Sequence, residues 1–315
     1  MTKHKTLVLA FGGNAITRQG QRGTFQEQLE NIELSCRDVV ELARLGYRMV
    51  ITHGNGPQVG SILIKNELAK DVLPPMPLDV CVANTQGSLG FGIAQVLQNM
   101  LLKAGVRREV AALVTRVRVD PGDEAFSNPS KPVGPFFTRA EAEEQTRSKG
   151  YAMREDSGRG WRRVVPSPRP LEILEGRVIR QLLEQEVVVV AAGGGGIPVV
   201  RDNSEYRGVE AVIDKDLAAL RLALDVGAAG LVILTGVPKV YLNYGRPNQE
   251  ALEKMTASQA ESYLKAGQFP AGSMGPKIEA AAEFVKQTGG TALITDPANL
   301  QAALHGETGT RIAKT

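Results

Sequence analysis

The chain has 315 residues, 43% of them hydrophobic, which is enough to bury a sizeable core as one large domain or two lobes. Its net charge of only +3 argues against a nucleic-acid-binding protein, and no apolar segment is long enough to span a membrane. Two cysteines without CxxC spacing, Cys36 and Cys81, indicate reduced thiols. Because Met1–Lys5 leads directly into a strand-like run, we expect no signal peptide and a cytoplasmic protein.

Strand-like runs alternate with helical patterns along the chain, as in a parallel sheet with crossover helices. The strands are expected at Leu7–Phe11, Met49–Thr52, Val110–Val117, Val187–Ala192, Leu231–Thr235 and Thr291–Thr295. The helices are expected at Phe25–Leu45, Val59–Ala69, Asp79–Ala104, Pro170–Gln185, Asp214–Leu224, Ser258–Ala266 and Ile278–Gln287, with a short hairpin between Gly196 and Asp214. This pattern predicts an α/β fold, a three-layer αβα sandwich around an open, mainly parallel sheet.

One segment, about residues 120–168, departs from this alternation with prolines, glycines and a charged helix-like piece near Arg139–Lys149. We interpret it as a flap, a small protruding subdomain. Seven basic residues between Arg147 and Arg169 either attract a phosphate or form a solvated face, and the second alternative is favoured. The chain is then a single domain over 1–315, with an N-lobe at about 1–186 and a C-lobe at about 187–315.

Three predicted strands end in glycine-rich loops. The loops contain Gly12, Gly13 and Asn14, then Gly54, Asn55, Gly56 and Gly60, and finally Gly193–Gly196. Glycine lets a ligand approach the backbone closely, and in open α/β sheets small molecules bind at the carboxyl ends of the strands. We therefore expect backbone amides to bind an anion at this edge.

These loops do not match the common nucleotide fingerprints. A dinucleotide site requires GxGxxG, but Pro198 and Val59 occupy the third glycine position in the two loops that come near it. No GxxxxGK[ST] sequence occurs. A Rossmann-type oxidoreductase and a P-loop protein are both disfavoured.

Three lysines, Lys131, Lys215 and Lys277, stand at helix starts or in loops rich in glycine or proline. They fit phosphoryl transfer, because catalysis of that reaction is mostly positioning and electrostatic stabilisation. Lys277 follows Pro276 at a predicted helix start, where a cation opposes the helix dipole and suggests a bound anion. Asp214 is a plausible N-cap.

Other chemistry has little support in the sequence. His53 is the only histidine near the loops, and a structural role for it is favoured over that of a base. The sequence contains no histidine and cysteine spacing for zinc and no GxSxG elbow.

Five collinear motifs resemble those of the carbamate kinases of the amino-acid kinase superfamily. They are AFGGNAI (Ala10–Ile16), THGNGPQVG (Thr52–Gly60), AAGGGGIPV (Ala191–Val199), VIDKDLAA (Val212–Ala219) and MGPKIEAA (Met274–Ala282). The resemblance covers essentially the whole chain and implies the amino-acid kinase fold and a homodimer. It implies reversible phosphoryl transfer between carbamoyl phosphate and MgADP, giving ATP and carbamate, in arginine or agmatine catabolism. Carbamate decomposes to ammonia and CO₂.

The resemblance also implies roles for single residues. The amides of Gly12, Gly13, Asn14, Gly54, Asn55 and Gly56 would hold carbamoyl phosphate. Lys131, Lys215 and Lys277 would neutralise the transferring phosphoryl group, with Asp216 orienting the last two. The nucleotide site would comprise Gly195, Asp214, Thr235, Gly236, Val237, Val240, Tyr244, Met274 and Lys277. Mg²⁺ would be held by phosphates and water, without protein ligands.

Two positions bear on the substrate. Ala10 stands where many amino-acid kinases have a lysine, and carbamate kinases resemble this chain in lacking it. Gly236 and Pro238 stand where relatives often have aspartates, which affects the nucleotide contacts. A non-catalytic sensor of nucleotide or carbamoyl phosphate and a sister acyl-phosphate kinase remain the alternatives. The three lysines argue against the sensor.

Overall fold

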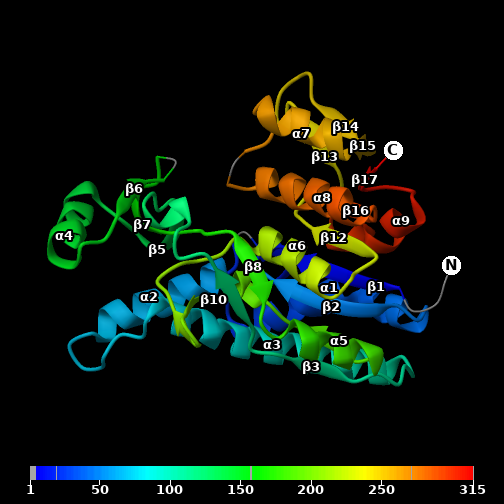
Figure 1. Cartoon of the computed structure of the whole chain (residues 1–315), viewed down its shortest axis with the longest axis horizontal. Helices are drawn as coiled ribbons and strands as arrows, with labels where there is room; N and C mark the ends of the chain where they lie inside the picture. The colour runs from blue at the N-terminus through cyan, green and yellow to red at the C-terminus, as the bar shows by residue number, and fades with distance from the viewer. Residues whose placement is uncertain (1–4, 19, 157, 271, 315) are drawn as a thin grey trace.

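An eight-stranded sheet forms the centre of the computed structural model, which describes residues 5–18, 20–156, 158–270 and 272–314 (Figure 1). In order across the sheet, the strands are β15 (Lys254–Thr256), β17 (Thr310–Ala313), β16 (Thr291–Thr295), β12 (Gly230–Leu234), β1 (Thr6–Phe11), β2 (Arg48–His53), β9 (Val188–Val190) and β3 (Val110–Ala112). Every neighbouring pair is parallel except β16 with β17. The sheet is therefore mainly parallel, as predicted.

Side chains of the central strands alternate between two buried faces. In β1, Leu9 and Phe11 pack in the same cluster as helices α1 (Phe25–Arg44) and α3 (Leu78–Lys103). Val8 and Ala10 pack on the opposite face with α5 (Gly176–Glu184), α6 (Lys215–Asp225) and α8 (Met274–Thr288). Figure 1 shows α3 and α8 on opposite sides of the strands. Helices on both faces confirm the αβα sandwich.

A second sheet lies beside the first, in the order β11 (Glu205–Gly208), β10 (Ile197–Asp202), β4 (Arg116–Val119) and β8 (Pro170–Ile173). Its β10–β11 pair confirms the short hairpin predicted after Gly196. The remaining elements of the body are β13 (Val240–Leu242), β14 (Glu250–Leu252), α2 (Gly56–Ala69), α7 (Ala257–Lys265), α9 (Leu300–His305), η1 (Gly13–Ala15), η2 (Glu124–Phe126), η3 (Gly193–Gly195) and η4 (Pro297–Asn299). No helix among the described residues combines the length and hydrophobicity that crossing a membrane requires.

The chain between β4 and β8 leaves the body as a flap, which Figure 1 shows projecting on the same side as α2. It contains β5 (Lys131–Phe137), α4 (Arg139–Lys149), β6 (Met153–Glu155) and β7 (Trp161–Val165), with the strands paired antiparallel in the order β5–β7–β6. Basic residues of this segment pair with acids. Lys149 contacts Glu67 on α2, for example, and Arg163 contacts Glu210. These two residues therefore belong to a charged, ion-paired face of the flap.

Two helices begin earlier than expected, α2 at Gly56 instead of Val59 and α8 at Met274 instead of Ile278. Two other predicted elements are wrong in extent for a different reason. The strand expected at Val110–Val117 is divided between β3 and β4, because the chain changes sheets where the side-chain amide of Gln86 binds the backbone of Thr115. The helix expected at Pro170–Gln185 begins only at Gly176, because residues 170–173 pair with β4 as strand β8. Both errors come from long-range contacts that local periodicity does not reveal.

Candidate active site

A cavity of about 270 Å³ opens where β1, β2 and β9 end. The glycine loops form one wall, with Gly13, Gly54 and Gly194 among its lining residues. The first turns of α6 and α8 form the opposite wall, and the flap contributes Lys131 and Arg162. This position at the carboxyl ends of parallel strands is the one that the sequence predicted.

The loop after β9 packs so tightly that it requires glycine. A Cβ on Gly194 would lie 2.0 Å from Nδ2 of Asn55, and a Cβ on Gly195 would lie 2.3 Å from the carbonyl oxygen of Ile213. Both glycines also have positive φ, 68° and 96°. The loop is therefore held against its neighbours by backbone contacts that side chains would prevent.

A buried polar network connects helix α3 to the loops that line the cavity. Gln86 on α3 donates from Nε2 to the carbonyls of Gly193 (3.1 Å) and Thr115 (3.2 Å), and its Oε1 accepts from the Thr115 amide at 2.7 Å. Nδ2 of Asn55 donates to Oγ1 of Thr85 on the same helix at 2.7 Å. Sequence analysis missed these roles of α3, because a polar residue within a helix gives no local indication of its partners.

Two lysines share one buried carboxylate on the opposite wall. Nζ of Lys215 lies 2.6 Å from Oδ1 of Asp216, and Nζ of Lys277 lies 2.9 Å from Oδ2 of the same residue. The Asp216 side chain is only 3% exposed. Asp214 caps α6 by accepting from the Asp216 amide at 2.9 Å, and its other oxygen lies 2.7 Å from Nζ of Lys131. The site therefore gathers three ammonium groups around two carboxylates.

Burial and charge act in opposite directions on these groups. Burial alone would raise the pKa of Asp216, but the charges of Lys215 and Lys277 outweigh burial and lower that pKa. Burial lowers the pKa of Lys215; the Asp216 charge opposes this shift and the Lys277 charge adds to it. The carboxylate is thus held ionised between two cations, which fixes the position of both lysines.

His53 is a buried structural residue at the end of β2 and does not line the cavity. Burial lowers its pKa to about 4; a hydrogen bond to the Gly54 carbonyl, 3.0 Å from Nδ1, opposes this shift and the charge of Lys215 adds to it. A Cβ on Gly193 would lie 2.3 Å from Nε2 of the ring. These contacts favour the structural role for His53 over that of a base.

The structure brings most of the predicted substrate-binding and catalytic residues together. Those that line the cavity are Gly13, Gly54, Asn55, Gly56, Lys131, Lys215, Asp216 and Lys277. Gly12 does not line the cavity and lies against the end of β12, where a Cβ would meet the carbonyl oxygen of Leu234 at 2.7 Å. The side chain of Asn14 lies outside the described part of the chain. Arg162 also lines the cavity, and sequence analysis included it only as one of the basic residues of the flap.

The predicted nucleotide-binding residues are more dispersed. Asp214 and Lys277 line the cavity, whereas Gly195, Thr235, Gly236, Val237, Val240, Tyr244 and Met274 are not among its lining residues. Thr235 follows β12 next to Gly12, since β1 and β12 are neighbours in the sheet. Val240 is fully buried, and Tyr244 is 63% exposed beside Tyr241. Their role in binding a nucleotide stays a prediction.

The described residues contain no group of three or more His, Cys, Asp or Glu side chains placed to hold a metal ion. The two acids of the site, Asp214 and Asp216, are both paired with lysines. This arrangement fits a divalent cation that arrives with phosphate ligands rather than one bound by a cage of carboxylates.

Glycine loops and three lysines that line one cavity on an αβα sandwich are the parts that a small-molecule kinase uses. The chain belongs to the amino acid kinase family, whose pattern matches residues 5–296. It is 47% identical to a carbamate kinase of Thermococcus kodakarensis, over 98% of this chain and 99% of that protein, and 47% identical to carbamate kinase 1 of Enterococcus faecium, over 94% of each.

Solved structures agree with this assignment. The carbamate kinase of Giardia lamblia bound to AMP-PNP matches with a TM-score of 0.94 and 44% identity, and the match covers all of both chains. A structure from Aeropyrum pernix matches with a TM-score of 0.94 and 41% identity, over 99% of this chain and all of that one. The amino-acid kinase fold predicted from the sequence is confirmed.

Replacing Gln86 with leucine is expected to lower the free energy of unfolding by about 2 kcal/mol or more. The variant leaves the Thr115 amide without its partner, and an unsatisfied buried group costs about 1–3 kcal/mol; the Gly193 carbonyl keeps the Gly196 amide as a donor. Urea unfolding measures the change. Gly87→Ala is the matched control, because a Cβ there meets open space, and it should leave stability equal or raise it by up to about 1 kcal/mol. Equal stability of the Gln86→Leu variant would contradict the network.

The pKa of His53 predicts that stability falls with acidification. The native ring stays neutral to about pH 4, whereas the unfolded ring binds a proton below pH 6.5, so the unfolded state gains protons first. The free energy of unfolding should fall by about 2 kcal/mol between pH 7.5 and 5. Asp216 adds a further loss of stability only at lower pH. Its native pKa lies below its ordinary value of 3.8, so the unfolded carboxylate binds a proton before the native one as pH falls below that value.

Urea midpoints at the two pH values test this dependence. His53→Gln should remove it, and His305→Gln, at the exposed end of α9, should retain it. An unchanged dependence in His53→Gln would show that another group is responsible.

Proposed function

We propose that the protein is a carbamate kinase, which transfers a phosphoryl group between carbamoyl phosphate and ADP. The observation that carries this proposal is the cluster of Lys131, Lys215 and Lys277 facing the glycine amides in one cavity. Relatives named carbamate kinase, similar over nearly the full chain, support the substrate.

In the ATP-forming direction, an oxygen of the ADP β-phosphate attacks the phosphorus of carbamoyl phosphate. A new P–O bond forms, the bond from phosphorus to the carbamoyl oxygen breaks, and its electron pair leaves with carbamate. Both the attacking and the leaving oxygen are anionic, so the reaction needs no general base. This agrees with the absence of His53 from the cavity lining.

The cavity residues position the substrate and neutralise the charge of the transferring phosphoryl group. Amides of Gly13, Gly54 and Gly56 hold the anionic substrate, as their place in the cavity wall supports. Lys215 and Lys277 neutralise the phosphoryl oxygens from positions that Asp216 fixes. The incoming phosphoryl group competes with Asp214 for the ammonium of Lys131. Mg²⁺ belongs to this proposal: it would be held mainly by the nucleotide phosphates and water and would neutralise phosphate charge.

The nucleotide is proposed to occupy the C-lobe side, beyond Lys277 and near Thr235, Val237 and Tyr244. Support comes from the position of Thr235 beside Gly12 at the carboxyl edge of the sheet. The Giardia lamblia relative was solved with AMP-PNP, an ATP analogue, which supports use of ATP and ADP. The loop after β12 is thus the proposed adenine side of the site.

The proposal includes a homodimer in the cytoplasm that makes ATP during arginine or agmatine breakdown. Phe25 on α1 and Phe91 on α3 stack at 6.2 Å although 46% and 55% exposed, which supports a second copy covering this face. Cys36 and Cys81 are free and buried, which supports a reducing compartment.

Formation of ATP from ADP, Mg²⁺ and carbamoyl phosphate tests the function, with acetyl phosphate and acetylglutamyl phosphate as competing donors. We expect ATP from carbamoyl phosphate alone, well above spontaneous decay of that donor. ATP from another donor would favour the sister acyl-phosphate kinase. No ATP from any donor would favour the sensor.

Lys215→Ala and Lys277→Ala should each lower turnover by about 100-fold or more, because each removes a charge from the transferring group. Circular dichroism checks that the fold is intact. Lys286→Ala is the matched control, since Lys286 lies on the same helix as Lys277 and pairs with Glu261 outside the cavity. Unchanged turnover in both site variants would contradict the assigned roles.

A further inference from the structure

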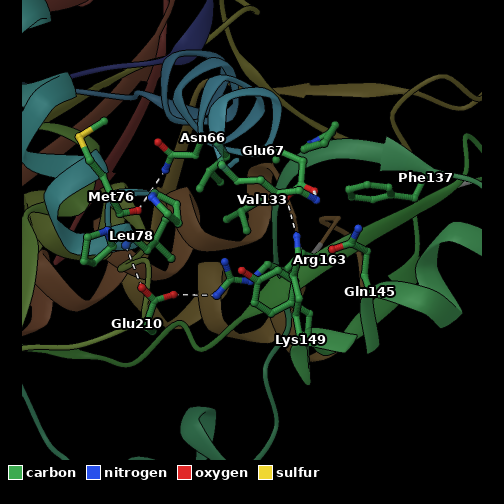
Figure 2. Close-up of a pocket in the computed structure, with 17 residues that line it drawn as sticks. Asn66, Glu67, Met76, Leu78, Val133, Phe137, Gln145, Lys149, Arg163 and Glu210 are labelled. Carbon is green, nitrogen blue, oxygen red and sulfur yellow. Dashed lines mark hydrogen bonds and ion pairs between the residues drawn. The ribbon is translucent and has the colours of Figure 1, made fainter. Parts of the chain in front are cut away.

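A second cavity lies outside the active site, between the flap and the body (Figure 2). Its volume is about 550 Å³, twice that of the active-site cavity, and small-molecule sites commonly measure about 300–1,000 Å³. The body contributes α2, the loop at 75–78 and Glu210, and the flap contributes β5, α4 and β7. A molecule in this cavity would contact flap and body together.

Much of the wall is hydrophobic. Leu63 of α2 and Leu78 of α3 line the cavity together with the flap residues Val133 and Phe137. Figure 2 shows Met76 at its edge. Prolines at 75, 77 and 135 add rigid apolar surface. A concave apolar wall of this kind favours a hydrocarbon or aromatic body in the ligand.

Two ion pairs cross the cavity from the flap to the body. Nζ of Lys149 lies 2.6 Å from Oε2 of Glu67, and Nη2 of Arg163 lies 2.7 Å from Oε2 of Glu210. Both cations belong to the flap and both acids to the body, as Figure 2 shows. Lys70 also lines the cavity and pairs with Glu67, so three cations face two acids. The lining has an excess of one positive charge.

We propose that this cavity binds a small amphipathic monoanion, an aromatic or aliphatic carboxylate or sulfonate. Its apolar body lies against Leu63, Val133 and Phe137. Its anionic group takes Lys149 from Glu67, which keeps Lys70 as a partner. The exchange replaces one partly exposed ion pair with another, and such pairs contribute little to stability, so burial of the apolar body determines the affinity.

Occupancy of this cavity would act on the flap strand that bears Lys131. Val133 lines both cavities, and it follows Lys131 by two residues on β5. A ligand that packs against Val133 therefore shifts the position from which Lys131 contacts its substrate. This coupling, unlike the binding itself, rests on the proposed carbamate kinase function.

Binding is tested with 1-anilinonaphthalene-8-sulfonate, a fluorescent aromatic sulfonate, on the full chain with excess ATP to fill the active site. We expect one saturable site in the native protein. Leu63→Trp fills the cavity and should weaken binding by about tenfold or more. The control Leu68→Ser, on the same helix but 81% exposed, should bind as the native chain does. Lys149→Gln should weaken binding by up to about fivefold, and Lys149→Arg should retain it.

Several outcomes would overturn the site. No saturable binding, equal affinity of Leu63→Trp and the native chain, or loss of binding in Leu68→Ser would do so, the last by placing the probe on the exposed surface of α2. If thermal melting shows that Leu63→Trp does not fold, the Lys149 variants decide, and equal affinity of Lys149→Gln, Lys149→Arg and the native chain overturns the proposal.

The coupling is tested by the KM for carbamoyl phosphate with and without saturating probe. We expect KM to change in the native chain and to stay constant in Leu63→Trp. If that variant does not fold, Lys149→Gln should require a higher probe concentration than the native chain for the same change in KM. A constant KM in the native chain overturns the coupling. A chain that forms no ATP from carbamoyl phosphate would contradict the proposed function and, with it, the coupling, while the probe titration still decides the binding site.

Discussion

The sharing of Asp216 by Lys215 and Lys277 is the interaction on which the site depends. Two ammonium groups in a partly buried cavity repel each other, and burial disfavours the charge of each. One ionised carboxylate between them offsets both effects and holds both lysines at the heads of two different helices. Because α6 and α8 pack on the same face of the sheet, the correct pairing of these helices also assembles the cation cluster.

The opposite wall is built by the sheet. Parallel pairing of β1, β2 and β9 brings three glycine loops to one edge, although almost 180 residues separate the first from the last. Glycine lets the loops approach each other, and Gln86 satisfies the buried Thr115 amide while it also donates to the Gly193 carbonyl. The anion site thus joins a backbone wall fixed by strand register to a charged wall fixed by helix packing.

Much of this arrangement was predictable from the sequence. Apolar runs ending in glycine identified β1, β2 and β9, and helix-start patterns identified Lys215 and Lys277. Contacts between distant segments were not predictable. The transfer of the chain from β3 to β4 depends on Gln86, and β8 forms only because β4 lies beside it. Arg162 reaches the cavity through a flap strand whose position no local pattern specifies. Local chemistry was therefore predictable, and long-range pairing was not.

The tight fit between two of the glycine loops restricts how this sequence can diverge. The ring of His53 and the amide of Asn55 occupy the space where side chains at Gly193 and Gly194 would begin. A larger residue at position 193 or 194 therefore requires a smaller residue at position 53 or 55, and a single substitution at 193 or 194 causes a steric clash. Position 53 is expected to vary together with position 193, and position 55 with position 194, so these two loops change as one unit even though they lie about 140 residues apart in the sequence.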